Sequence, residues 1–287
     1  MNSVSVSRPG PNIIRITVDC GTSSNTTMPI VFSADHHWDN PKSKHEIIKR
    51  HLDWARENEA LVCLIGDTFC LMQGKNDRRG SKSDIRPEHN TSAYFNAVLD
   101  TAYDFYSPYA DLFAMISPGN HETAITKHNE INITNMFVRD LNRAGGNCQV
   151  GKYSGFIQIM FKQGRASFSY WVYYNHGSGG GGPVTKGVIQ TNRTAVYQPD
   201  ADLVVKGHIH ESWMVELMRE RVSSSGHTWI EPQVHLQQPT MKEEYLAHEG
   251  FHIEKGRPQK PLGSYAVNFH SYKNIKRESH FDVVRLR

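Results

Sequence analysis

The sequence lacks segments that would direct the chain to a membrane or anchor it there. Its first residues, MNSVSVSRPGPN, contain no apolar run of the kind that a signal peptide needs. No stretch approaches the roughly 18 consecutive apolar residues of a membrane span. We therefore expect a cytoplasmic protein that has no membrane partner.

Cysteine is scarce, with 4 residues among 287. Cys20, Cys63, Cys70 and Cys148 form no CxxC pair, so they predict neither a zinc knuckle nor a disulfide framework. Free thiols in a reducing compartment are the simplest interpretation. A metal site in this chain should therefore use other ligands.

Excess charge of one sign is also absent, because 32 basic and 29 acidic side chains leave a net charge of +3. This balance neither indicates nor excludes a nucleic-acid partner. The 16 His residues are the unusual feature, since imidazole is the commonest protein ligand for transition metals. We find no internal repeat and no linker. We therefore expect a single domain over 1–287, with a β-rich C-terminal part from about 211 that carries no motif.

Hydrophobic patterning predicts a mixture of strands and helices. Short apolar runs and paired alternating segments predict strands at 13–18, 29–34, 61–66, 111–116, 156–162, 166–174 and 202–207. Amphipathic spacing predicts helices at 43–58, 91–106, 129–143 and 186–198. This mixture favours an α/β protein with two β-rich halves and helices outside them.

The segment 72–90 holds almost no apolar side chains, which predicts a long surface loop. It carries five basic residues and also acidic ones. A solvated loop and a lid that contacts substrate are both open interpretations.

Five of the predicted strands each lead into a polar cluster. Ligands of open α/β sheets bind beyond the carboxyl ends of the strands, so these clusters should meet at one site. The candidate ligands are Asp35, His37, Asp67, Asn120, His176, His208 and His210.

The types of these residues narrow the choice of metal. Imidazole and oxygen ligands without thiolate suit Mn, Fe, Zn, Co or Ni better than calcium, which prefers oxygen alone. Seven ligands are too many for one tetrahedral ion and suit two ions that share a carboxylate. Two-metal sites clamp the attacking and leaving oxygens of a displacement at phosphorus. The pattern therefore predicts two divalent transition-metal ions, with Mn the leading choice, and a phosphoester substrate.

The order of these motifs resembles the calcineurin-like metallophosphoesterases. The matching motifs run from residue 35 to 210 and read DHH (35–37), GD (66–67), GNHE (119–122), His176 and GHIH (207–210). The resemblance implies a four-layer αββα sandwich in which helices flank two central mixed β-sheets.

The resemblance also implies a role for each residue. Asp35, His37 and His210 would hold one metal, and Asn120, His176 and His208 the other. Asp67 would bridge the two metals. His121 would face the substrate as the catalytic residue. Cys70 departs from the family, where many members have Asp or Asn at that place.

The function implied is hydrolysis of a nucleotide or nucleic-acid phosphodiester by in-line attack of a metal-bridging hydroxide. The absence of GDxxDRG sets the chain apart from the protein Ser/Thr phosphatases and nearer to the phosphodiesterase and nuclease branches. Two alternatives stay open, a phosphomonoesterase with the same site and a non-catalytic scaffold that keeps the fold.

Overall fold

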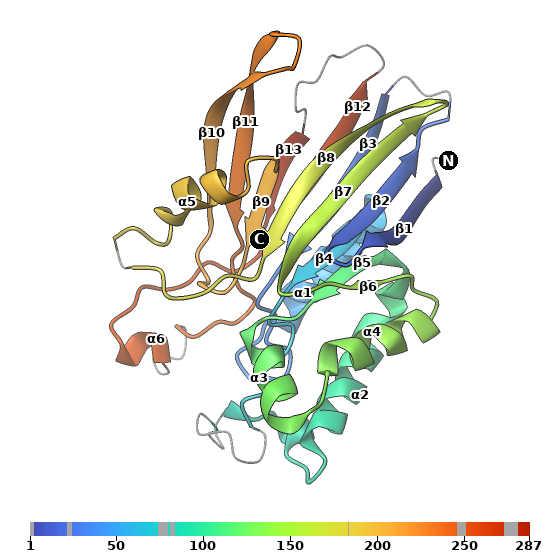
Figure 1. Cartoon of the computed structure of the whole chain (residues 1–287). Coiled ribbons are helices and arrows are strands. Elements are labelled where there is room, and N and C mark those ends of the chain that lie inside the picture. The colour runs from blue at the N-terminus through green and yellow to red at the C-terminus, as the bar shows by residue number, and fades with distance from the viewer. Residues whose placement is uncertain are drawn as a thin grey trace.

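The computed structural model describes residues 3–21, 25–73, 80, 84–182, 184–245, 251–272 and 281–287. Its strands form two sheets (Figure 1). The seven-stranded sheet has the order β1-β2-β7-β8-β9-β11-β10, and the six-stranded sheet has the order β13-β12-β3-β4-β5-β6. Both sheets are mixed, so the expected sandwich of two mixed sheets is confirmed.

The seven-stranded sheet combines the N-terminal strands with strands from the second half of the chain. Its strands are β1 (Ser3–Gly10), β2 (Ile13–Asp19), β7 (Ser154–Gln163), β8 (Ala166–Asn175), β9 (Leu203–Lys206), β10 (Trp213–Val222) and β11 (Thr228–Gln237). The pairs β2–β7, β8–β9 and β9–β11 are parallel.

The six-stranded sheet is built around three consecutive parallel pairs, β3–β4, β4–β5 and β5–β6. Its strands are β3 (Asn25–Ser33), β4 (Leu61–Ile65), β5 (Phe113–Ser117), β6 (Gln149–Val150), β12 (Ser264–Tyr272) and β13 (Phe281–Leu286). The segment after 211 thus supplies two strands to each sheet.

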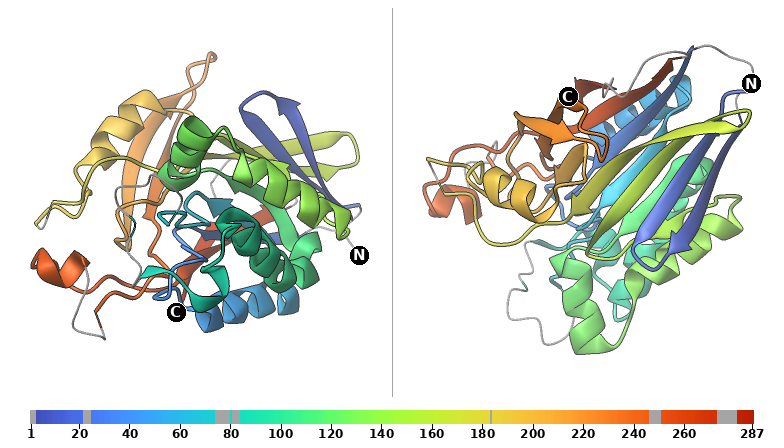
Figure 2. Two further views of the ribbon diagram at one scale, coloured as in Figure 1. Left: turned by 90° about the horizontal axis from the view of Figure 1, so that it is seen from below. Right: turned by 45° about the horizontal axis from the view of Figure 1, so that its top comes forward.

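The helices cover the two sheets unequally. They are α1 (His45–Glu57), α2 (Tyr94–Tyr106), α3 (Asn120–Asn129), α4 (Ile133–Arg143), α5 (Gln190–Tyr197) and α6 (Phe251–Glu254), with 3₁₀ turns at Pro87–His89 and Ser107–Leu112. Figure 2 shows α1, α2 and α4 gathered outside the six-stranded sheet. The seven-stranded sheet is contacted by α5, where Lys206 Nζ donates to Thr194 Oγ1 at 2.5 Å. No helix in the described part of the chain is long and apolar enough to cross a membrane.

Two apolar cores hold these layers together. One lies between the two sheets and includes Ile16, Phe32 and Val205, each fully buried. The other lies between the six-stranded sheet and the helices and includes Leu52 and Phe137. Burying one such side chain contributes about 1.5–3 kcal/mol, so these layers fix the strand ends rigidly.

Two expectations about the helices are corrected. The helix expected at 129–143 begins later, as α4 at Ile133, and the separate helix α3 before it, which ends at Asn129, was not predicted. The helix expected at 186–198 is shorter, because Gly187 has a left-handed φ of 82° and α5 starts at Gln190. Strand β1 was not predicted.

Candidate metal centre

The polar clusters lie together because the strands before them end at one edge of the sandwich. Asp35, Asp67 and Asn120 follow β3, β4 and β5 of the six-stranded sheet. The histidines follow the other sheet, with His176 after β8 and His208 and His210 after β9. The candidate site therefore spans both sheets.

Two groups of side chains have the spacing of metal ligands. Asp35, His37 and His210 form one group, and Asp67, His176 and His208 form the other. Within each group the possible ligand atoms all lie within 4.8 Å of one another. These are the residues that the sequence placed at the two sites.

The first group leaves buried polar atoms without partners. His37 Nε2 and His210 Nε2 are 3.2 Å apart, and Asp35 Oδ1 lies 3.2 Å from His210 Nε2. Asp35 Oδ1 and His37 Nδ1 are buried and make no hydrogen bond among the described residues. Leaving such atoms unpaired is costly, and a cation that binds Asp35 would remove part of that cost.

Asn120 joins the second group through its side-chain oxygen. Asn120 Oδ1 lies 2.8 Å from His208 Nδ1 and 3.1 Å from His176 Nε2. His176 Nδ1 donates to the carbonyl of Ile65 at 2.8 Å, which turns Nε2 toward the group. A backbone partner of this kind fixes the ring that a metal needs.

The charges of the second group also suit a cation. Burial acts to lower the pKa of His176, but Asp67, whose Oδ2 is 3.1 Å from Nε2, raises the pKa to about 10. Burial acts to raise the pKa of Asp67, but His121 and His176 outweigh it and lower the pKa. The group thus attracts positive charge, and a metal ion would replace the proton on His176.

Five of the seven predicted ligands have a left-handed backbone. Such conformations cost of order 1–3 kcal/mol and cluster at functional sites, where the surrounding fold imposes them. These residues, with φ between 47° and 74°, are Asp35, His37, Asp67, His208 and His210.

Backbone hydrogen bonds hold Asp35 and His37, in the loop after β3, in this conformation. The N–H of Asp35 donates to the carbonyl of Gly66 at 3.1 Å, and the N–H of His37 donates to that of Asp67 at 3.0 Å. The C-terminal part supports the same turn, since Thr240 Oγ1 donates to the carbonyl of Asp35 at 2.9 Å.

Two positions in the motifs require glycine because the side chains of predicted metal ligands lie close to them. A Cβ on Gly66 would lie 2.3 Å from His176 Nδ1. A Cβ on Gly119 would lie 2.1 Å from Asp67 Oδ1. Any side chain at either position would push a predicted ligand away.

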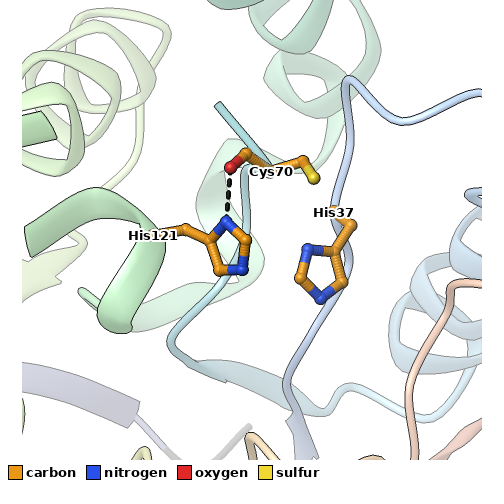
Figure 3. Close-up of side chains that lie close together, drawn as sticks. All are labelled: His37, Cys70 and His121. Atoms are coloured by element: carbon orange, nitrogen blue, oxygen red, sulfur yellow. Dashed lines mark hydrogen bonds between the residues drawn. The ribbon is translucent and has the colours of Figure 1, made fainter. Parts of the chain in front are cut away.

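His121 stands beside the two groups. Its Nδ1 hydrogen-bonds the carbonyl of Cys70 at 2.5 Å (Figure 3). Its Nε2 lies 3.6 Å from Asp67 Oδ2. The ring also meets that of His37 edge-on, with centroids 5.0 Å apart. The Nε2 atom therefore faces the site.

A third trio, His37, Cys70 and His121, also has metal-ligand spacing, which the sequence did not suggest (Figure 3). Burial raises the pKa of the Cys70 thiol well above its usual range, so the sulfur is protonated. The first two trios contain the buried carboxylates Asp35 and Asp67 and therefore suit a cation better.

Glu122 and Asp39 hold the loop that carries Asp67. Glu122 Oε2 accepts from the N–H groups of Asp67 and Gly119 at 3.2 and 2.8 Å, and Oε1 accepts from that of Phe69 at 2.9 Å. Burial and Asp67 together raise the pKa of Glu122 to about 8. Asp39 accepts from the N–H groups of Cys70 and Leu71, a role that no motif signalled.

His36 turns away from the site, as expected for a residue between two ligands. Its Nε2 lies 2.8 Å from Ser33 Oγ and its Nδ1 lies 2.8 Å from Tyr106 Oη. Both ring nitrogens therefore have partners in the core.

Comparisons with known proteins identify similar folds. No protein-family model matches the sequence, and no curated protein matches it. Vps29 from Entamoeba histolytica, solved with Zn²⁺, is 11% identical over 91% of this chain and 100% of its own, with a TM-score of 0.38. GAP50 of Plasmodium is 10% identical over 91% and 89%, with a TM-score of 0.46. The calcineurin-like phosphoesterase YfkN from Bacillus subtilis is 11% identical over 91% of each chain, with a TM-score of 0.37. At these values none of the three bears on activity.

Proposed function

We propose that this protein is a two-metal phosphoester hydrolase that prefers phosphodiesters. The observation that carries the proposal is the pair of ligand trios at one edge of the sandwich, one around Asp35 and one around Asp67. Asp67 would bridge the two ions, since its charge acts on His37 of the first trio as well as on His176 of its own.

The ligand chemistry favours particular metals. Imidazole nitrogens mixed with carboxylate and amide oxygens suit Mn, Fe, Zn, Co or Ni, and Mn is our first choice. When bound, two such ions would lower the pKa of water and neutralise the charge that develops on phosphoryl oxygens.

The chain's own residues would supply orientation and proton transfer. Asn120 and the four metal-facing histidines follow closely on the ends of rigid strands, which keeps their positions fixed. As an imidazolium, His121 would give its Nε2 proton to the departing oxygen while its Nδ1–H stays hydrogen-bonded to the carbonyl of Cys70.

The test compares a bis-aryl with a mono-aryl phosphate in the presence of Mn²⁺. We expect faster hydrolysis of the diester, and Asp67→Asn should lose both metals and all turnover, because two dications would share too little negative charge. Faster hydrolysis of the monoester would favour the phosphomonoesterase. A metal-loaded protein that hydrolyses neither substrate would be a scaffold.

A further inference from the structure

A basic groove lies next to the metal centre on the side of α4. It has a volume of ≈ 990 Å³ and is walled by α4, the end of β1 and the segment 148–153. None of the described residues that line it is acidic. Four cationic side chains line it: Arg8, Arg139, Arg143 and Lys152.

These cations are only partly neutralised. Asp140 pairs with Arg139 and Arg143, at 3.0 and 3.2 Å, so one carboxylate serves two guanidinium groups. The two arginine side chains keep 52% and 70% of their surface exposed. Among the described residues, Arg8 bonds to the carbonyls of Pro11 and Val150 and to no carboxylate. The groove therefore carries an excess of positive charge.

The groove shares its wall with the metal centre at two contacts. Thr123, which lines it, donates its hydroxyl to the carbonyl of Asn120 at 3.2 Å. Tyr153, which also lines it, packs edge-on against the ring of His176, with centroids 5.6 Å apart. None of the predicted metal ligands lines the groove, so a bound strand would pass over Thr123 and Tyr153 to reach the second ligand trio.

We propose that this groove binds the phosphate backbone of a nucleic-acid strand whose scissile phosphate lies at the metal centre. The inference rests on the proposed function. The groove runs beside α4, whose 11 residues extend about 16 Å at 1.5 Å per residue. That length spans several nucleotide steps of about 3.4 Å, so the lining beside α4 offers cationic contacts to more than one phosphate. Cationic contacts to phosphate position a strand without reading its sequence.

The test measures binding separately from hydrolysis. The probe is a fluorescent single strand of about 12 nucleotides, within the usual site size, with phosphorothioate linkages that resist cleavage. Arg143→Gln combined with Lys152→Gln should weaken binding on the order of tenfold near 0.1 M salt. Each lost contact should also flatten the slope of log K against log salt by about 0.7.

The matched control is Lys162→Gln combined with Arg165→Gln. It removes the same charge at the β7–β8 hairpin tip, which is the opposite end of these strands from the site. The proposal would be overturned if both double variants weaken oligonucleotide binding equally. It would also be overturned if the groove variant keeps the slope of log K against log salt of the unaltered protein. Hydrolysis of the aryl diester by the unaltered protein is measured beside it. If the unaltered protein does not hydrolyse the aryl diester, the proposed function is wrong, and the binding result then tests the groove by itself.

Discussion

The carboxylate of Glu122 holds the backbone of Asp67, accepting its N–H at 3.2 Å while also accepting the N–H of Gly119 at 2.8 Å. These two hydrogen bonds join the GD and GNHE motifs through one buried side chain. Glu122 is therefore a positioning residue for the ligand that we expect to bridge the metals.

Glu122→Gln should loosen this arrangement. An amide offers one oxygen where the carboxylate offers two, so at least one of three backbone donors loses its acceptor. We expect metal affinity to fall about 10- to 100-fold, the usual effect of losing a group that orients a ligand. The free energy of unfolding should fall by about 1–3 kcal/mol. Metal titration and urea unfolding measure the two effects, with Glu57→Gln on exposed α1 as the control. Unchanged metal affinity would contradict the positioning role.

His121→Gln should separate metal binding from catalysis. Its Nε2 faces Asp67 from 3.6 Å, but His121 belongs to neither of the trios that contain a carboxylate. We expect full metal content and a rate that is lower by about 10²- to 10⁴-fold, as for a lost acid–base group. Elemental analysis beside steady-state kinetics measures both. Loss of metal from the variant would make His121 a ligand instead.

Cys70→Ser should leave metal content unchanged. The residue acts through its backbone, since its carbonyl accepts from His121 and its N–H donates to Asp39 at 2.6 Å. A serine keeps both of these hydrogen bonds. Elemental analysis of the variant, with Cys148→Ser as a buried-thiol control, checks this. A selective loss of one metal equivalent at position 70 would show that the third trio binds metal.

Asp202 should make stability depend on pH. Burial raises its pKa to about 6, although the N–H of Trp171 donates to its Oδ2 at 2.8 Å. Between about pH 4 and 6 the unfolded chain loses this proton and the native protein keeps it, so stability falls as pH rises. The loss reaches about 3 kcal/mol above pH 6. Asp202→Asn should abolish it.

Urea unfolding at pH 4 and pH 8 measures this effect. Asp202→Asn should gain stability relative to the unaltered protein at pH 8 far more than at pH 4. Asp104→Asn on the exposed face of α2 should show no such difference. Parallel pH profiles for Asp202→Asn and the unaltered protein would refute the assignment.

Hydrophobic patterning predicted an α/β protein with two β-rich halves, and the family resemblance implied the sandwich. LVCLIG before Asp67 and DLVVKG before His208 are short apolar runs that end in glycine, the local signal of a buried strand that leads into a ligand site. The ligand roles themselves stay predictions.

Other features have no pattern of this kind. Helix α3 buries only Glu122 and Ile125, so its apolar periodicity is too weak to detect. Strand β1 lies at the sheet edge with most of its side chains exposed. The left-handed backbone of Asp35 and His37 depends on hydrogen bonds to a distant loop, which no local signal reveals. The basic residues Arg78, Arg79 and Lys82 of the 72–90 loop lie outside the described residues, so their role as a substrate contact stays a prediction.

The ligands come from both sheets, which gives the metals a mechanical role as well as a chemical one. Ions bound between Asp35 and Asp67 on one sheet and His176, His208 and His210 on the other would hold the two sheets together at this edge. Chelation would remove the ions that join the two carboxylates to these histidines. Amide hydrogens at this edge would then exchange faster with solvent, while those at the β7–β8 hairpin tip would keep their protection. The bound metals would thus determine how firmly the two sheets are held together at this edge.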